Sequence, residues 1–302
     1  MDMKTLGVLD IGSHSVHLEI FDLCPNVEPR SLYSKSMESH VGRTVGQVGR
    51  IPRPLEKHLH SCVRQLLKKA RKKEAKTVLL VATAGFRKAA NGREVLRQLE
   101  KKSRQRVRLL TPDKEAEFGF LGIRSQLNSH AKQLVIDCGG GSTEVSLAQG
   151  RNRRTHVTLP LGAATLSLEA QANPPGPTDL VAITMKCADY LRRLPNSVSP
   201  QHAIVSGGVI KDLQRLFPDG DPKTVTFRHI DRAMRLVMRK KSKKIAKAFE
   251  LNPEDVVNLM PAAATLSSVL KHYHLDKATY TDKSIRNGIA IAYRRSHSRW
   301  CQ

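Results

Sequence analysis

A strand that ends in an aspartate and turns on glycine into a second strand occurs twice in this chain. The first copy is VLDIGSHSVHLEI at 8–20, and the second is LVIDCGGGSTEVSLAQG at 134–150. Each predicts a β-hairpin, because apolar runs flank a short turn of glycine and small polar residues. A plain turn needs one glycine or two, so three glycines followed by hydroxyls indicate that something charged approaches the main chain. The repeat predicts two halves of similar architecture.

Strands and helices alternate within both halves. The continuous apolar run at 77–85 predicts a buried strand, and the spacing of leucines at 52–73 predicts an amphipathic helix with a lysine-rich end. The pattern then repeats after the second hairpin begins. The chain is therefore predicted to be an α/β protein with two domains, 1–124 and 125–302.

Helices dominate the later part of the second domain. One long basic helix is predicted at 229–249, and another begins at Asn252 and Pro253, which suit the N-cap and the first helical position. The last helix is predicted at 284–296, still within the second domain.

The charge of the chain is far from balanced. It has 51 Lys plus Arg against 27 Asp plus Glu, a formal net charge of +24. Such an excess favours a polyanionic partner, namely nucleic acid, an anionic membrane surface or polyphosphate. A generally basic surface with no such ligand is the alternative, because net charge alone names no partner. Charge therefore leaves nucleic acid open.

Cysteine usage and hydropathy limit the class of protein. The five cysteines are scattered and none forms a C-x-x-C pair, so neither a zinc site nor a disulfide framework is indicated. The chain starts directly in a strand pattern and has no apolar run of about 18 residues. We therefore expect a cytoplasmic protein that does not enter the membrane.

The two hairpins together indicate a phosphate site. Turn amides form concave sites for anions, and aspartates beside them can hold a divalent cation directly or through water. Two ordinary Asp-Gly hairpins are the alternative, and for one hairpin alone that alternative is preferred. The matched pair favours phosphate binding.

Seven segments resemble one known family. DIGSHSVHLEIFD, VATAGFRKAANG, PDKEAEFGFLG, VIDCGGGSTEV, LPLGAATL, VSGGVIKDL and YTDKSIRNGIA occur in the order and spacing of the exopolyphosphatase/guanosine pentaphosphate phosphohydrolase (Ppx/GppA) family. The resemblance spans nearly the whole chain. It implies two actin-like (ribonuclease H-like) lobes of the actin/sugar kinase superfold, with a cleft between the lobes.

The resemblance also implies roles for individual residues. Glu115 matches the general base that deprotonates the attacking water, and Arg87 matches an arginine near the bound phosphates. Asp10, Asp137 and Glu144 match positions that bind Mg²⁺ (or Mn²⁺) or orient water. The implied phosphate-binding residues are Gly12, Ser13, His14, Ser15, Gly139, Gly140, Gly141, Ser142, Thr143, Gly207 and Gly208.

Four positions depart from the family pattern. His14 stands where asparagine is usual, and Val209 replaces a common threonine. Lys114 precedes the implied base where a carboxylate is frequent, and Glu117 stands where arginine is frequent. These departures bear on the substrate more than on the fold.

The resemblance implies an exopolyphosphatase that hydrolyses terminal phosphoanhydride bonds of inorganic polyphosphate and releases orthophosphate. Removal of the 5′-terminal phosphate of guanosine pentaphosphate is the alternative enzyme activity. A non-catalytic sensor that binds polyphosphate or a guanosine alarmone is the alternative outside enzymes. Kinase activity is less favoured, because no adenosine-binding segment is recognisable. The resemblance leaves a homodimer open.

Overall fold

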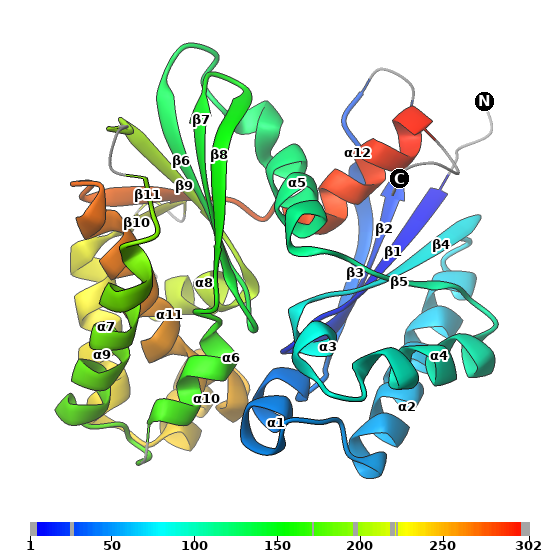
Figure 1. Ribbon diagram of the computed structural model, residues 1–302, viewed down its shortest axis with the longest axis horizontal. Helices are drawn as coiled ribbons and strands as arrows, with labels where there is room; N and C mark the ends of the chain where they lie inside the picture. Colours follow the sequence, from blue (N-terminus) through cyan, green and yellow to red (C-terminus); the bar gives the residue numbers. More distant parts are fainter. Residues whose placement is uncertain are drawn as a thin grey trace. The chain divides into compact units, whose positions relative to one another are not determined.

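The structure is a computed structural model, and it describes residues 5–24, 27–170, 172–195, 199–217, 221 and 223–296. The chain divides into two compact units, Met1–Ile123 with Lys283–Gln302, and Arg124–Asp282 (Figure 1). Each unit has one mixed sheet with helices packed against it. Among the described residues, no helix is both long enough and apolar enough to cross a membrane.

The first unit has a five-stranded sheet in the order β3-β2-β1-β4-β5. Its strands are β1 (Thr5–Ile11), β2 (Ser15–Asp22), β3 (Arg30–Glu38), β4 (Thr77–Ala82) and β5 (Val107–Leu109). The first hairpin forms β1 and β2 as predicted, and β3 continues the antiparallel pairing. Strands β4 and β5 lie parallel to β1, so the carboxyl ends of these three strands lie at the same edge of the sheet.

Helices cover both faces of this sheet. Side chains along each strand alternate between the faces, and β1 has apolar side chains on both, so each face needs helices to bury it. They are α1 (Val41–Val48), α2 (Arg53–Lys72), α3 (Ala84–Lys88), α4 (Gly92–Ser103), α5 (Pro112–Ile123) and α12 (Ile285–Ser296). Leu9 and Ile11 of β1 belong to the core formed with α2 and α4. Leu6 and Val8 belong to the core formed with α5 and α12.

The last helix packs with the first unit, which the sequence does not indicate. Helix α12 crosses α5 at very short range. A Cβ atom on Gly288 would lie 1.8 Å from the carbonyl oxygen of Phe118, and one on Gly122 would lie 2.2 Å from that of Ser284. Only glycine permits this approach. The chain changes unit after Ile123, next to the predicted boundary at 124, and α12 returns to the unit where the chain began.

The second unit has a six-stranded sheet in the order β10-β11-β9-β6-β7-β8. Its strands are β6 (Lys132–Cys138), β7 (Thr143–Gln149), β8 (Asn152–Leu159), β9 (His202–Ser206), β10 (Thr224–Thr226) and β11 (Lys277–Tyr280). Strands β6, β7 and β8 are antiparallel neighbours, and β9 and β11 run parallel to β6. Without β10, this order and these directions repeat those of the first sheet. The fold prediction of two ribonuclease H-like units is confirmed.

A buried helix organises the core of the second unit. Helix α11 (Pro253–His272) is apolar along most of its length and packs against α7 (Pro177–Leu191), α8 (Gly208–Arg215), α9 (Phe227–Arg239) and α10 (Ser242–Phe249). The predicted cap is confirmed, because the side chain of Asn252 accepts a hydrogen bond from the Glu254 N–H at 3.3 Å. Short helices α6 (Ala163–Leu166), η1 (Arg124–Gln126) and η2 (Ser167–Glu169) complete the unit.

The basic helix predicted at 229–249 is two helices in the structure, so that prediction is wrong. Helix α9 ends at Arg239, and α10 starts at Ser242. The side chain of Asn173 accepts the Ser242 N–H at 3.0 Å and donates to Ser242 Oγ at 2.7 Å. A new helix start is stabilised there by a residue 69 positions earlier in the chain. No proline or glycine marks the break in the sequence.

Candidate active site

The turn between β1 and β2 is held by the segment that follows β3. The carbonyl oxygens of Gly12 and His14 accept hydrogen bonds from the Ser39 hydroxyl and the Ser39 N–H, both at 2.8 Å. The Ser13 carbonyl accepts from the Gly42 N–H at 2.7 Å. These bonds turn three carbonyls toward this segment, which favours an anion on the amide side of the turn.

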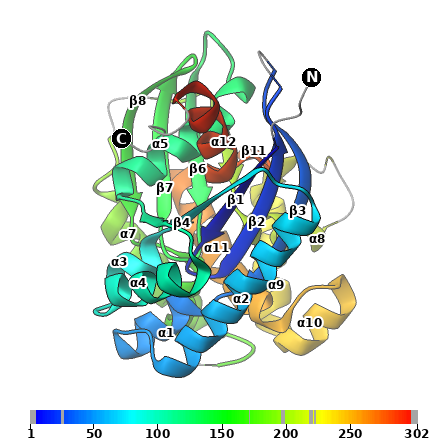
Figure 2. The same cartoon turned by 90° about the vertical axis from the view of Figure 1, so that its right-hand side faces the viewer.

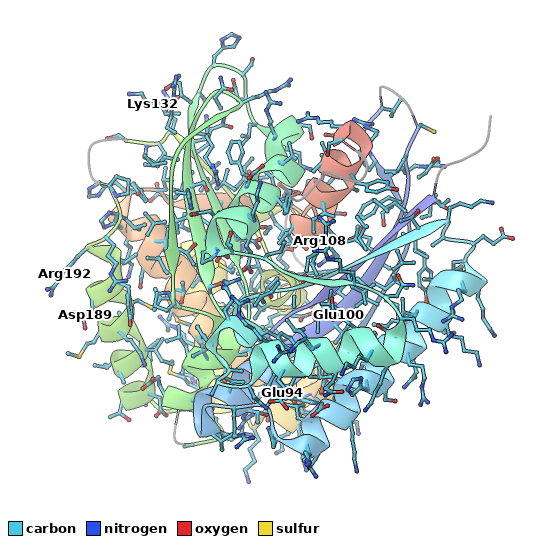
Figure 3. The ribbon with its side chains drawn as sticks, turned by 45° about the vertical axis from the view of Figure 1, so that its right-hand side comes forward. Glu94, Glu100, Arg108, Lys132, Asp189 and Arg192 are labelled. Carbon is cyan, nitrogen blue, oxygen red and sulfur yellow. The ribbon has the colours of Figure 1, made fainter. Side chains whose placement is uncertain are left out.

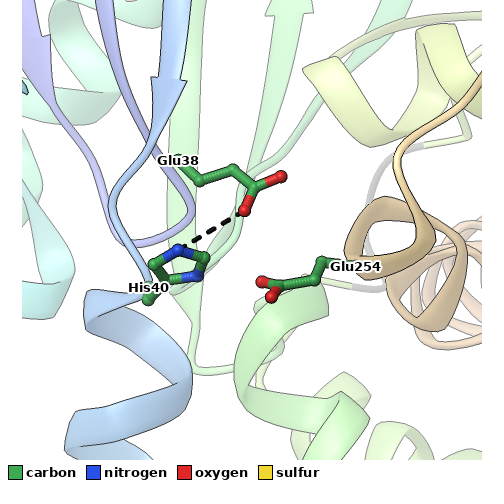
Figure 4. A group of neighbouring side chains, drawn as sticks. All are labelled: Glu38, His40 and Glu254. Carbon is green, nitrogen blue, oxygen red and sulfur yellow. Dashed lines mark ion pairs between the residues drawn. The ribbon is translucent and has the colours of Figure 1, made fainter.

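Ser39 lies between Glu38 and His40 in the sequence, and the side chains of these two neighbours contact each other. His40 Nε2 is 3.4 Å from Glu38 Oε2 (Figure 4), and the His40 backbone is left-handed with φ 57° just before α1. The contact fixes the path of the chain around Ser39. Sequence reasoning missed Ser39, because its role depends on the position of β3 beside β2.

Ser13 is the predicted phosphate ligand with the clearest geometry in the first unit. The residue is 4% exposed, and its hydroxyl has no hydrogen-bond partner among the described residues. A Cβ atom on Gly85 would lie 2.9 Å from Ser13 Oγ, so the glycine leaves room for this hydroxyl. A buried hydroxyl without a partner is costly, and a phosphate oxygen would satisfy it.

Asp10 is the last residue but one of β1, close to this turn. Its Oδ2 lies 3.7 Å from Arg286 Nη1, and Arg286 Nε also donates to Glu19 at 2.9 Å. Arg286 lies on α12 in the first unit. A cation beside Asp10 offsets the negative charge that a divalent ion would use, so the metal role of Asp10 stays a prediction. Arg286 lies in the segment YTDKSIRNGIA, but the sequence does not indicate that it contacts Asp10 and Glu19.

Arg87 and Glu115, the two predicted catalytic residues, contact each other directly. Arg87 Nη1 donates to Glu115 Oε2 at 2.6 Å and to the Leu110 carbonyl at 2.8 Å. Arg87 lies on α3 after β4, and Glu115 lies on α5 after β5. Because β4 and β5 are parallel neighbours, both side chains lie beyond the carboxyl ends of adjacent strands, where open α/β sheets bind their ligands.

The two departures on α5 form an ion pair. Lys114 Nζ lies 3.2 Å from Glu117 Oε2, one helical turn apart. The opposite charges of these two side chains therefore offset each other beside Glu115.

In the second unit, two predicted metal ligands lie opposite each other on neighbouring strands. Asp137 of β6 pairs in register with Glu144 of β7, which points both side chains to one face with their Cβ atoms about 5 Å apart. Burial raises the pKa of the adjacent Cys138 thiol, and the charges of Asp137 and Glu144 raise it further. Two hard, mostly buried carboxylates suit Mg²⁺ or Mn²⁺.

Ser206 orients one of these carboxylates. Its hydroxyl donates to Asp137 Oδ1 at 2.9 Å, because β9 runs parallel to β6 with Ser206 beside Asp137. Gly207 follows with φ 128°, and a Cβ atom there would lie 2.3 Å from the Cys138 carbonyl. Gly208 then opens α8, with open space where its Cβ would be. The predicted Gly207 and Gly208 thus directly follow Ser206, the residue that donates to the Asp137 carboxylate.

The glycine turn of the second hairpin is held as the first one is. The carbonyls of Gly139 and Gly140 accept hydrogen bonds from Ala163 and Ala164 N–H groups, both at 3.0 Å. A Cβ atom on Gly162 would lie 2.2 Å from the Gly141 carbonyl carbon, so only glycine fits there. Sequence reasoning included LPLGAATL in the resemblance without giving Gly162 this function.

The remaining residues of this turn differ in what they offer a ligand. Thr143 is buried and its hydroxyl donates to the Leu161 carbonyl at 2.8 Å, so this side chain supports the turn. Ser142 accepts the Gly139 N–H at 3.0 Å through its carbonyl oxygen. In each unit, the structure thus gathers predicted site residues at the ends of β-strands in that unit.

Comparison with known proteins gives consistent matches. The model of the Ppx/GppA phosphatase family matches residues 26–297. Exopolyphosphatase 1 of Mycobacterium leprae is 30% identical over 173 residues, which cover 57% of this chain and 51% of that protein. Exopolyphosphatase 1 of Mycobacterium tuberculosis is 27% identical over 217 residues, covering 70% of this chain and 63% of that protein. The chain thus spans about half to two thirds of these relatives' length.

Solved structures show the same fold at low sequence identity. An exopolyphosphatase from Cytophaga hutchinsonii has a TM-score of 0.86 at 17% identity, covering 96% of this chain and 98% of that one. The Aquifex aeolicus member of the Ppx/GppA family has a TM-score of 0.78 at 21% identity, covering 98% and 100%.

Proposed function

This chain belongs to the Ppx/GppA phosphatase family, and on that basis we propose that it hydrolyses the terminal phosphoanhydride bond of inorganic polyphosphate and releases orthophosphate. The observation that most supports the proposal is the contact between Arg87 and Glu115 at 2.6 Å. It puts a proton acceptor and a planar cation together beyond the strand ends, as in-line attack of water on a terminal phosphate requires.

Glu115 acts as the general base in this proposal. Its carboxylate accepts a proton from the attacking water, and the Arg87 contact to Glu115 and Leu110 holds both side chains in one orientation. As the substrate binds, the other guanidinium nitrogens of Arg87 face phosphate oxygens and offset charge on the transferring group. The Ser13 hydroxyl and the turn amides position the phosphates.

Asp137 and Glu144 hold the divalent cation in this proposal. Their donor atoms are hard oxygens on one face of the β6–β7 hairpin, and Ser206 fixes one of them. A bound Mg²⁺ or Mn²⁺ would neutralise phosphate oxygens and so ease attack on phosphorus.

Substitution of the base tests this function. Glu115→Gln keeps size and hydrogen bonding but removes proton acceptance, so turnover should fall by about 10²–10⁴-fold. Polyphosphate binding should survive, because the substitution removes one negative charge from a site that binds polyanions. The matched control is Glu94→Gln, the same change at an exposed residue of α4 in the same unit, which should leave turnover near the wild-type value.

Orthophosphate release and polyphosphate binding are measured on the same three proteins. Unchanged turnover in Glu115→Gln would remove Glu115 from the mechanism. Tight binding with no phosphate release by the wild type would favour the non-catalytic sensor instead.

A further inference from the structure

A groove between α2 and α4 in the first unit lies outside the candidate active site. It has a volume of about 400 Å³, and the two helices lie side by side on one face of the sheet (Figure 2). We call this hollow the α2–α4 groove. Its lining residues are Lys57, His60, Ser61, Val63, Arg64, Leu67, Arg71, Leu99, Lys102 and Ser103. None of the predicted catalytic, metal or phosphate-binding residues is among them.

Four cationic side chains line the groove. Lys57, Arg64 and Arg71 follow one another at intervals of seven residues, which puts them on one face of α2. Lys102 faces them from α4. All four are exposed, and none of them forms an ion pair with any residue that the structure describes. Their charges therefore add in one place, which favours an anion there.

No carboxylate lines the groove to compensate these charges. Helix α4 has two acidic residues, Glu94 and Glu100 (Figure 3), and neither is a lining residue. Glu100 is engaged elsewhere, because its Oε1 accepts the Val107 N–H at 2.8 Å. Glu56 of α2 contacts His60 Nε2 at 3.3 Å and is likewise outside the lining.

The base of the groove is apolar. Val63, Leu67 and Leu99 form its floor, and all three belong to the buried core of this unit. Ser103 Oγ donates to the Leu99 carbonyl at 2.7 Å, and Ser61 Oγ accepts from Gln65 Nε2 at 3.2 Å. Partial burial lowers the pKa of His60, and the nearby charge of Lys102 lowers it further. A concave site with an apolar floor and a few charged side chains around it is typical of a binding site for a small molecule.

We propose that the α2–α4 groove binds a small, multiply charged phosphate compound at a site separate from the catalytic residues. The volume suits a ligand of this kind, since small-molecule sites measure about 300–1,000 Å³. Two guanidinium groups and two ammonium groups match several phosphate oxygens, and Arg64 and Arg71 can each bind two of them at once.

Titration of isotopically labelled protein with two probes, ATP and inorganic tripolyphosphate, tests this site. Both are added in EDTA, and amide chemical shifts are followed by NMR. We expect saturable shifts of amides at 57–71 and 99–103. Tighter binding of ATP would support an organic phosphate, and equal binding would support an inorganic one; both agree with the proposal.

Charge reversal with a matched control completes the test. Arg64→Glu with Arg71→Glu should weaken this binding by at least about tenfold. Lys68→Glu with Lys72→Glu makes the same change of charge on α2 at exposed residues outside the lining, and should change it less than about twofold. Arg64→Gln with Arg71→Gln repeats the first test without new carboxylates, and unfolding temperatures verify that all variants fold.

Two results would overturn the proposal. One is the absence of shifts at 57–71 and 99–103 with either probe. The other is equal weakening of probe binding by the two arginine substitutions and by the two control lysine substitutions. The effect would then come from net charge alone. Because binding is measured without hydrolysis, failure here and failure of the proposed catalysis give different results.

Discussion

At the residue scale, Lys114 and Glu117 show how two departures from an expected pattern can combine in one local interaction. They stand on either side of Glu115 and Ala116 and form a 3.2 Å ion pair. The pair puts one cation and one anion near the proposed base. In the sequence, Lys114 and Glu117 are two separate departures. The helix places them one turn apart, so that together they form one ion pair.

Exchange of the two charges tests this account. Lys114→Glu alone puts four carboxylates at positions 113, 114, 115 and 117 of α5 and should lower both stability and turnover. Lys114→Glu with Glu117→Arg restores an ion pair and should return the unfolding free energy to within about 0.5 kcal/mol of the wild type. Thermal unfolding and phosphate release on both single variants and the double variant provide the measurement. Additive effects of the two changes would contradict the coupling.

Several site residues could be predicted from the sequence, and others could not. Asp137 and Glu144 are visible because one hairpin contains both, and strand alternation fixes their shared face. Ser206 is 69 residues from Asp137, and Arg286 is 267 residues from Glu19. Such contacts arise from strand order and helix packing, which local patterns do not contain.

At the scale of elements, the β6–β7 hairpin is the proposed metal site. If Asp137 and Glu144 hold the cation, EDTA should abolish hydrolysis, and Mg²⁺ or Mn²⁺ should restore it. Asp137→Asn should raise the Mg²⁺ concentration needed for half-maximal activity by at least about tenfold.

The control for this metal prediction is an exposed aspartate in the same unit. Asp189 of α7 contacts Arg192 at 3.6 Å on the surface (Figure 3), and Asp189→Asn should leave the Mg²⁺ requirement unchanged. Full activity of the wild type in metal-free buffer with EDTA would contradict the metal assignment.

Element prediction from sequence succeeds where a signal is local. The cap of α11 is confirmed because Asn252 and Pro253 act within one turn. The break between α9 and α10 is missed because Asn173 causes it from a distance. Helix α12 has ordinary helical spacing, and its packing with α5 depends on Gly122 and Gly288 meeting across the unit.

At the scale of the whole molecule, the net charge of +24 predicts salt-sensitive capture of polyanions. Salt at about 0.1 M screens exposed charges beyond about 10 Å. A long polyphosphate spans more basic side chains than tripolyphosphate does. Its Michaelis constant should therefore rise more steeply with salt, which steady-state kinetics at several salt concentrations would show. Equal salt dependence for both substrates would assign the basic surface to another partner.

The two units repeat one sheet topology, and each places an Asp-Gly hairpin at its centre. That repetition is the structural counterpart of the two similar hairpins in the sequence. It supports a phosphate-binding role for both turns, because the same hairpin with an aspartate before its glycine turn occurs in both units.

Orthophosphate release by the purified wild-type protein tests the central claim most directly. Long polyphosphate, tripolyphosphate and guanosine pentaphosphate are compared side by side, each with and without Mg²⁺. Our account predicts Mg²⁺-dependent release from long polyphosphate at a higher kcat/KM than from guanosine pentaphosphate. Release from guanosine pentaphosphate alone, or no release from any of the three with Mg²⁺ present, would contradict it.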